Sequence, residues 1–207
     1  MSLNKFTSVE KGRNIALEIG CKTLEADEVV CEELNVATLP SSIYASYAPV
    51  VIQNTDVPTT MFGANFFGDT LLPENTLKEG YAFKVSFSGS LQSLSAETLT
   101  FTLLLGFGGS IQVVSVLPSP AFGNMGNQRW SLEYTVVCHK DGLLDKAYTV
   151  ADFKTSLPTQ LSAYSGNQFD SDVDFSTQQR INVLATWSNP SAGNVLTIQK
   201  AVIERLR

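Results

Sequence analysis

Few side chains in this sequence could carry acid–base or nucleophilic chemistry. His139 is the single histidine of the 207 residues, and it directly follows Cys138. A thiol and an imidazole can act as nucleophile and base, but adjacent residues of a strand point to opposite faces of a sheet. We therefore interpret His139 as an exposed residue at a strand end, and we predict that the chain is not an enzyme and has no catalytic residues.

Three carboxylates stand at alternate positions in Asp170, Asp172 and Asp174. Oxygen ligands at this spacing could hold Ca²⁺, and an acidic, solvated loop is the alternative. The run lacks the glycine at its sixth position and the glutamate at its twelfth that a helix–loop–helix calcium site requires. We favour the acidic loop and predict no metal and no cofactor, with calcium binding at Asp170–Asp174 left open.

The glycine-rich run from Gly106 to Ser110 has some likeness to a phosphate-binding loop. It lies between two predicted strands, however, and no helix N-terminus follows that could bind an anion. We expect a hairpin turn. The three cysteines (Cys21, Cys31 and Cys138) are too few for a disulfide framework and show no zinc-binding spacing, so reduced thiols are expected, with a Cys21–Cys31 pair left open.

Composition excludes several classes of partner. Charged residues make up only 16% of the chain, against about 25% in an average globular protein. The 14 basic residues are scattered and the net charge is −6, which argues against binding to nucleic acid or to an anionic membrane surface. The sequence shows no secretory leader and no run of about 18 apolar residues, so we expect synthesis without export and no membrane insertion.

Alternating apolar and polar residues predict β-strands from Tyr81 onward. Tyr81, Phe83, Val85 and Phe87 share one face of the first strand, and Trp130, Leu132, Tyr134, Val136 and Cys138 share one face of another. Turn-forming residues separate the segments. The strong strand predictions cover 81–87, 98–105, 111–117, 130–138, 181–187 and 195–203, and weaker ones lie near Val50, Met61, Tyr148 and Phe175.

Eight to ten strands with no convincing helix between them predict an all-β fold, an antiparallel β-sandwich of jelly-roll type over residues 43–207. We place Trp130 and Trp187 in its core, and we expect the run from Phe62 to Asp69 to be a loop packed onto the head. Val114 and Val137 interrupt the alternation with apolar side chains on the second face. A strand that is apolar on both faces lies between two layers or faces another subunit, and we favour a contact of Val114 and Val137 with another subunit.

The N-terminal segment, residues 1–42, has a different pattern. Apolar residues return every five positions, which fits neither a helix nor a strand well: Ile19, Leu24, Val29, Leu34 and Leu39. One interpretation is a short repetitive stem whose thin apolar edge is buried only when chains associate. A short amphipathic helix from Leu24 to Leu34 is the alternative, because Glu and Ala favour helix.

Two segments of the C-terminal half have a distinctive pattern: Trp130-Ser-Leu-Glu-Tyr-Thr-Val-Val-Cys, and the final hairpin, where Asn194-Val-Leu-Thr-Ile-Gln-Lys-Ala-Val-Ile-Glu-Arg-Leu follows a small polar turn. In this pattern the chain resembles the heads of virion fibres and spikes from large DNA viruses, virophages and some phages. The resemblance covers about 75 residues. Such heads are jelly rolls similar to tumour necrosis factor and form trimers, and the resemblance carries over no receptor-binding residue.

We therefore expect a homotrimeric viral structural protein in the virion, joined to capsid proteins by its N-terminal segment and presenting a head to a host-surface receptor or glycan. The candidate contact loops are Gly106–Ser110, Pro118–Gln128 and Ser188–Asn194. Three heads would strengthen weak single contacts through multivalency. The alternatives are a minor capsid or cement protein and a soluble carbohydrate-binding or cytokine-like β-sandwich module.

Overall fold

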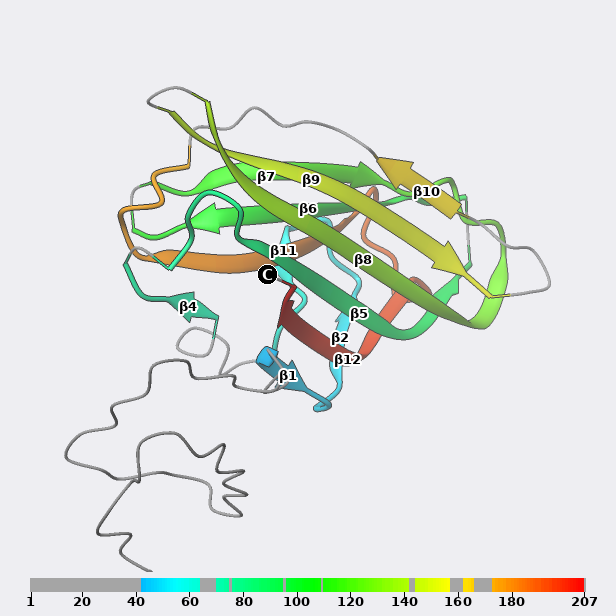
Figure 1. The fold of residues 1–207 in the computed structure, drawn as a ribbon. Coiled ribbons are helices and arrows are strands. Elements are labelled where there is room, and N and C mark those ends of the chain that lie inside the picture. Colours follow the sequence, from blue (N-terminus) through cyan, green and yellow to red (C-terminus); the bar gives the residue numbers. More distant parts are fainter. Residues whose placement is uncertain are drawn as a thin grey trace, which may run out of the picture. The chain divides into compact units, whose positions relative to one another are not determined.

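Long antiparallel strands dominate the computed structural model (Figure 1). The chain divides into two units, and the second, which begins at Thr38, holds all the residues described below. The structure describes residues 42–63, 70–74, 76–94, 96–108, 110–141, 144–156, 162–165 and 173–206. The predicted stem with Ile19, Leu24, Val29, Leu34 and Leu39 lies outside these residues, as do Cys21 and Cys31. The predicted boundary after residue 42 stays a prediction.

Within the described residues the strands form two antiparallel sheets. The first sheet has the order β1 (Ser42–Ser46), β12 (Val195–Arg205), β5 (Ala82–Ser93), β8 (Met125–Asp141), β9 (Leu144–Thr155) and β10 (Ser162–Ser165), and β2 (Val50–Gln53) also pairs with β12. The second has the order β3 (Thr59–Thr60), β11 (Gln179–Trp187), β6 (Leu99–Gly106) and β7 (Gln112–Pro118), and β4 (Leu71–Leu72) also pairs with β11.

The strand order is that of a jelly roll. Eight strands can be numbered one to eight in chain order: β2, β3, β5, β6, β7, β8, β11 and β12. The first sheet then has the order one, eight, three, six, and the second has the order two, seven, four, five. Two Greek keys wound in this way define the fold. β9 and β10 continue the first sheet beyond β8, so the predicted β-sandwich is confirmed with one addition at its edge.

An aromatic cluster fills the space between the sheets. Phe101 on β6 stacks against Trp130 on β8, with 6.2 Å between ring centroids, and lies 5.1 Å from Phe153 on β9. Trp187 is 1% exposed and donates from Nε1 to the carbonyl of Ile52 at 3.4 Å. Both tryptophans are therefore core residues, as predicted, because the alternation places them on the inner faces of their strands.

Several sequence-based strand predictions need correction. The segment 42–46, which has no clear alternation, forms β1 because β12 offers it an edge. Phe175, predicted to lie near a strand, is instead a buried turn residue. Of the loop predicted from Phe62 to Asp69, residues 64–69 lie outside the described residues. The Phe62 ring packs onto the head as predicted, edge-on against Tyr44 at 5.2 Å and near Phe87 at 5.0 Å.

Val114 does not lie on a second, outward face as predicted. A β-bulge shifts the register between β6 and β7 after Leu103, and Val114 is the extra residue on β7. Its side chain is 0% exposed in the core, whereas Val113 is 43% exposed. A bulge turns one additional side chain toward the same face, which the sequence pattern does not show. Val137 is 41% exposed on the outer face, and its predicted contact with another subunit stays a prediction.

Candidate functional site

Four strand connections gather at one end of the sandwich, which we call the loop end. They join β2 to β3, β5 to β6, β7 to β8 and β11 to β12, and they alternate between the sheets as jelly-roll topology requires. Backbone hydrogen bonds join three of them: the Ser188 N–H donates to Thr98 at 3.0 Å, and the Phe122 N–H donates to Glu97 at 2.7 Å. The β5–β6, β7–β8 and β11–β12 connections are therefore linked into one surface.

The Glu97 carboxylate links two of these connections through side chains. Its Oε2 accepts hydrogen bonds from the Ser188 hydroxyl and, at 2.8 Å, from Nδ2 of Asn189. The Ser188 Oγ in turn accepts from the Thr98 N–H at 3.0 Å. Hydrogen bonds to a charged acceptor are stronger than neutral ones, so this cluster fixes the start of the β11–β12 connection.

A buried amide anchors the other end of the same connection. Asn194 is 0% exposed, and its Oδ1 accepts hydrogen bonds from the Ser93 hydroxyl and the Leu94 N–H, each at 3.2 Å. Leu94 is nevertheless 56% exposed and lies on Gly193, where a Cβ would come within 2.1 Å of Leu94 Cδ1. Leu94 is thus an apolar side chain presented to solvent from a fixed backbone.

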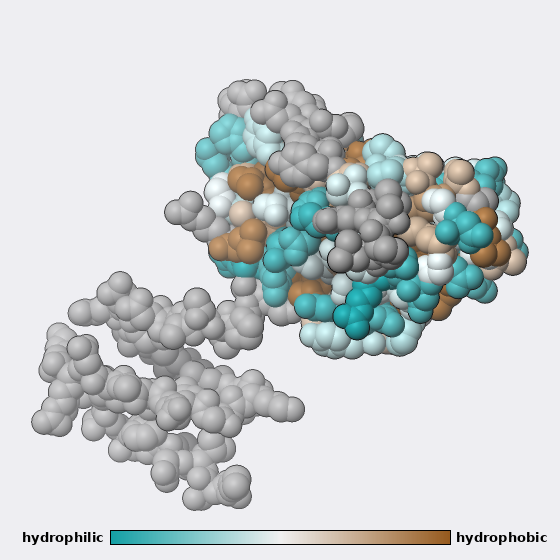
Figure 2. Space-filling model, turned by 90° about the vertical axis from the view of Figure 1, so that its right-hand side faces the viewer, coloured by the Kyte–Doolittle hydropathy of each residue, from teal (hydrophilic) through white to brown (hydrophobic). Residues whose placement is uncertain are grey.

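Phe122 closes the core beneath the loop end. Its ring is 0% exposed and packs edge-on against Phe153 and Trp187, with centroids 6.1 Å and 6.0 Å away. The Ser119 hydroxyl oxygen accepts a hydrogen bond from the Leu99 N–H at 2.9 Å. Figure 2 views the sandwich from this side and shows small apolar areas separated by polar ones. This mixture of polar groups and single aliphatic side chains suits contact with a macromolecule rather than enclosure of a small substrate.

The Gly106–Ser110 candidate loop lies at the opposite end. It forms the predicted turn between β6 and β7, with φ of +132° at Gly106 and +64° at Gly108. The other two candidate loops, 118–128 and 188–194, both contribute to the loop end, although β8 already begins at Met125. Gly106–Ser110 therefore cannot share one contact surface with them.

An open groove of about 410 Å³ also lies at this opposite end. It is lined by Leu77, Lys78, Glu79, Lys140, Asp145, Phe175 and Ser176. Asp145 pairs with Lys140 at 4.0 Å and accepts the Phe175 N–H at 3.0 Å. The charged groups that line the groove thus bind one another in part, and they assemble no nucleophile with a base.

The Cys138–His139 pair does not form a nucleophile and base. His139 is exposed, and its ring centroid lies 5.5 Å from that of Tyr148. The Cys138 thiol is 1% exposed, and burial, followed by the charge of Asp145, raises its pKa to about 12. A thiol that stays protonated and buried is a poor nucleophile.

The Asp174 carboxylate accepts hydrogen bonds from a residue two positions further along the chain. Its Oδ1 accepts hydrogen bonds from the hydroxyl and the N–H of Ser176, the latter at 2.9 Å, and these bonds lower the pKa of the carboxyl. Asp170 and Asp172 lie outside the described residues. In the part of the chain that the structure describes, no three His, Cys, Asp or Glu side chains are grouped to hold a metal ion.

Sequence reasoning included Asn194 in a candidate loop but missed Glu97 and Leu94. Turn residues around Ser188 and Asn189 indicated a loop, but the partners of that loop stand about 90 to 100 positions earlier in the chain. Such contacts depend on the jelly-roll winding and leave no local signal. Among the described residues there is also no helix with the length and apolar character to cross a membrane.

The fold is that of a jelly-roll β-sandwich protein whose loop end carries polar groups and single exposed aliphatic side chains. No protein-family model matches the chain, and no curated protein matches it. One solved structure, described as the CBM2 module of Lactobacillus casei BL23 phage J-1 evolved Dit, is 14% identical with a TM-score of 0.29. The match covers 65% of this chain and 66% of that one, and a likeness this low carries no functional argument.

Proposed function

We propose that this chain is a viral structural protein, the subunit of a homotrimeric spike or fibre that attaches to the capsid through its N-terminal segment and presents its head to a host-surface receptor or glycan. Support comes from the family resemblance of the C-terminal half and from the jelly-roll topology that this resemblance implied. In this proposal the protein resides in the virion and is not an enzyme.

One observation carries the proposal: the chain enters the head at the end opposite the loop end. Ser42 on β1 pairs with Glu204, close to the end of β12, whereas Val195 at the start of β12 pairs with Gln53 and Gln92 beside the loop end. A segment that precedes Ser42 would join the head on the far side from the loops. That arrangement suits an anchored stem with an outward contact surface.

The alternative functions have less support. A carbohydrate-binding module commonly stacks an exposed Tyr or Trp ring on a sugar. Both tryptophans of the chain are buried, at 3% and 1% exposed, and Tyr47, at 70% exposed, lies in the β1–β2 connection, which is not part of the loop end. No observation specifically favours a cytokine-like module or a minor capsid or cement protein. We therefore retain the trimeric spike as the proposed function.

The mass of the full chain in solution tests this function. Light scattering at micromolar concentration is expected to give three times the 22.5 kDa of one chain. Negative-stain images are expected to show elongated pins, each with a head at one end. A monomeric mass, or featureless particles of compact outline, would contradict the proposal.

A further inference from the structure

Two exposed valines lie together on the outer face of the first sheet. Val137 on β8 pairs with Tyr148 on β9, and Val150 on β9 pairs with Thr135 on β8, so the valines are diagonal neighbours about 7–8 Å apart. Val137 is 41% and Val150 is 42% exposed. We call Val137, Tyr148 and Val150 the β8–β9 patch.

A second apolar patch lies on the other sheet. Phe107 and Ile111 in the β6–β7 turn are 42% and 55% exposed, and Val113 on β7 is 43% exposed. We call these three residues the β7 patch. The segment from Ile111 to Pro118 contains no charged residue. The bulge at Val114 and Pro118 at the end of β7 protect part of this uncharged edge, while the three apolar side chains of the patch stay exposed and are available to a partner.

The two patches flank the same edge of the sandwich. β7 is the last strand of the second sheet and lies against β9 of the first (Figure 1). β10 pairs with residues 151–154 of β9, so among the described strands the part of β9 from Leu144 to Val150 forms the edge of its sheet. Both patches also lie in the half of the head away from the loop end. The two patches thus lie on different sheets, on either side of this edge.

We infer, on the basis of the proposed homotrimer, that the β8–β9 patch of each subunit packs against the β7 patch of the next. An isologous dimer needs one self-complementary patch, whereas a cyclic ring needs two different patches that complement each other. Two dissimilar patches on either side of one edge meet the requirement for a ring. The occupant of each patch is thus a second copy of this chain.

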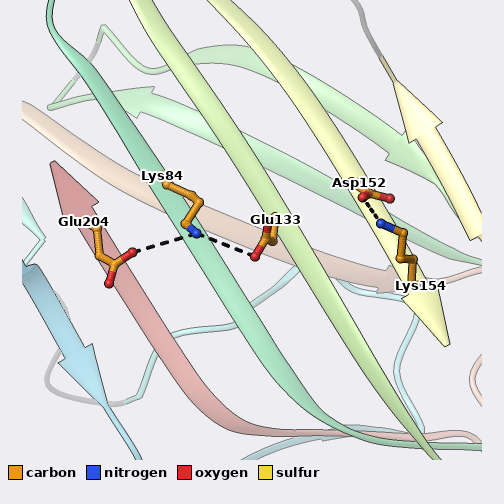
Figure 3. Close-up of polar contacts among 5 residues, drawn as sticks. All are labelled: Lys84, Glu133, Asp152, Lys154 and Glu204. Atoms are coloured by element: carbon orange, nitrogen blue, oxygen red, sulfur yellow. Dashed lines mark hydrogen bonds and ion pairs between the residues drawn. The ribbon is translucent and has the colours of Figure 1, made fainter. Parts of the chain in front are cut away.

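Opposite charges lie beside the two patches. Figure 3 shows the rows that adjoin the β8–β9 patch, where three carboxylates face two ammonium groups. Lys84 lies 3.7 Å from Glu133 and 3.9 Å from Glu204, and Asp152 binds Lys154. Glu133 and Asp152 are direct partners across β8 and β9 and lie next to the Thr135–Val150 pair. Lys146, a third ammonium group on the same face, lies at the other end of the patch beside Tyr148. Beside the β7 patch the guanidinium of Arg180 lies 5.1 Å from the centroid of the Phe107 ring.

Charge substitutions in each patch test this interface in the full chain. Val137→Lys and Val113→Glu are each expected to convert the trimer to a monomer, as measured by light scattering. If the N-terminal segment still holds the chains together, each variant is expected to lower the unfolding midpoint instead. Leu94→Glu is the matched control, since Leu94 is 56% exposed at the loop end, and it is expected to change neither quantity. Far-UV circular dichroism checks that every variant keeps its strands.

Mixing the two variants distinguishes a ring from a symmetric pair. The intact β8–β9 patch of the Val113→Glu chain can still bind the intact β7 patch of the Val137→Lys chain. The other junction sets the introduced Lys against the introduced Glu, whose charges attract. The mixture is therefore expected to give species larger than a monomer, while each variant alone stays monomeric.

The outcomes separate this interface from the proposed function. A wild-type chain that is monomeric contradicts the homotrimer itself. If the wild type is trimeric, two results overturn the interface assignment alone. Either both patch variants keep the mass and the unfolding midpoint of the wild type, or Leu94→Glu dissociates the trimer as strongly as they do. A homodimer formed by one variant alone would also overturn the assignment, because it requires a self-complementary patch.

Discussion

Nδ2 of Asn189 lies 2.8 Å from Oε2 of Glu97, although 92 residues separate the two in the chain. The pair joins the β11–β12 connection to the β5–β6 connection. These connections come from different pairs of strands and meet only because the jelly roll brings their ends together. The contact makes the shape of the loop end depend on the whole fold.

Removal of the Glu97 carboxylate is expected to loosen the loop end. Glu97→Ala removes the acceptor for Ser188 and Asn189, and we expect a loss of about 1 kcal/mol in the free energy of unfolding, measured with urea. Amide exchange at Ser188 and Asn189 should speed up. Glu74→Ala, which removes an exposed carboxylate elsewhere, should leave both quantities unchanged, and an equal effect there would contradict the role of Glu97.

Loss of the Asn194 side chain is expected to lower the free energy of unfolding more than loss of the Glu97 carboxylate. Asn194→Ala removes the buried acceptor of the Leu94 N–H and Ser93 hydroxyl, and a buried donor that loses its acceptor costs about 1–3 kcal/mol. Urea unfolding measures the change. Asn189→Ala, an exposed amide in the same connection, should cost clearly less, and a smaller effect at Asn194 than at Asn189 would show that the buried bonds do not hold the loop.

Gly89 on β5 pairs with Ile198 on β12, next to the β-bulge between Ile198 and Lys200. A Cβ at this position would come within 1.9 Å of the Thr197 carbonyl oxygen, which is part of the backbone and cannot turn aside. Gly89→Ala is therefore expected to destabilise the head by about 3 kcal/mol in thermal or urea unfolding. At Gly126 on β8 a Cβ meets nothing within 4 Å, so Gly126→Ala should change stability by no more than about 0.5 kcal/mol.

Cys138 is expected to make stability fall at alkaline pH. Its folded pKa of about 12 exceeds the unfolded value of about 8.5, so the unfolded chain releases a proton that the folded chain keeps. The stability from the protonated thiol is fully present below pH 8.5 and is lost as pH rises toward 12. Urea unfolding between pH 7 and 9.5 should show this slope in the wild type and a shallower one in Cys138→Ala.

The same burial predicts low reactivity of the thiol. At pH 8 an alkylating reagent should leave Cys138 unmodified in the native protein and modify it in urea, as read by mass spectrometry of the peptide. Rapid modification in the native state would contradict the buried position.

The sequence by itself determined the fold class and the inner faces of β5 and β8, and it showed no local catalytic motif. Tyr81, Phe83, Val85 and Phe87 are all buried as their alternation predicted, because period-two patterning follows directly from strand geometry. Tertiary structure decided what depends on distant neighbours. β1 forms because β12 offers it an edge, Val114 turns inward at a bulge set by its pairing with β6, and Glu97 meets Asn189 through the winding of the sheets. Side-chain alternation is a property of a few consecutive residues, whereas pairing partners and loop contacts are fixed only when the whole chain is wound.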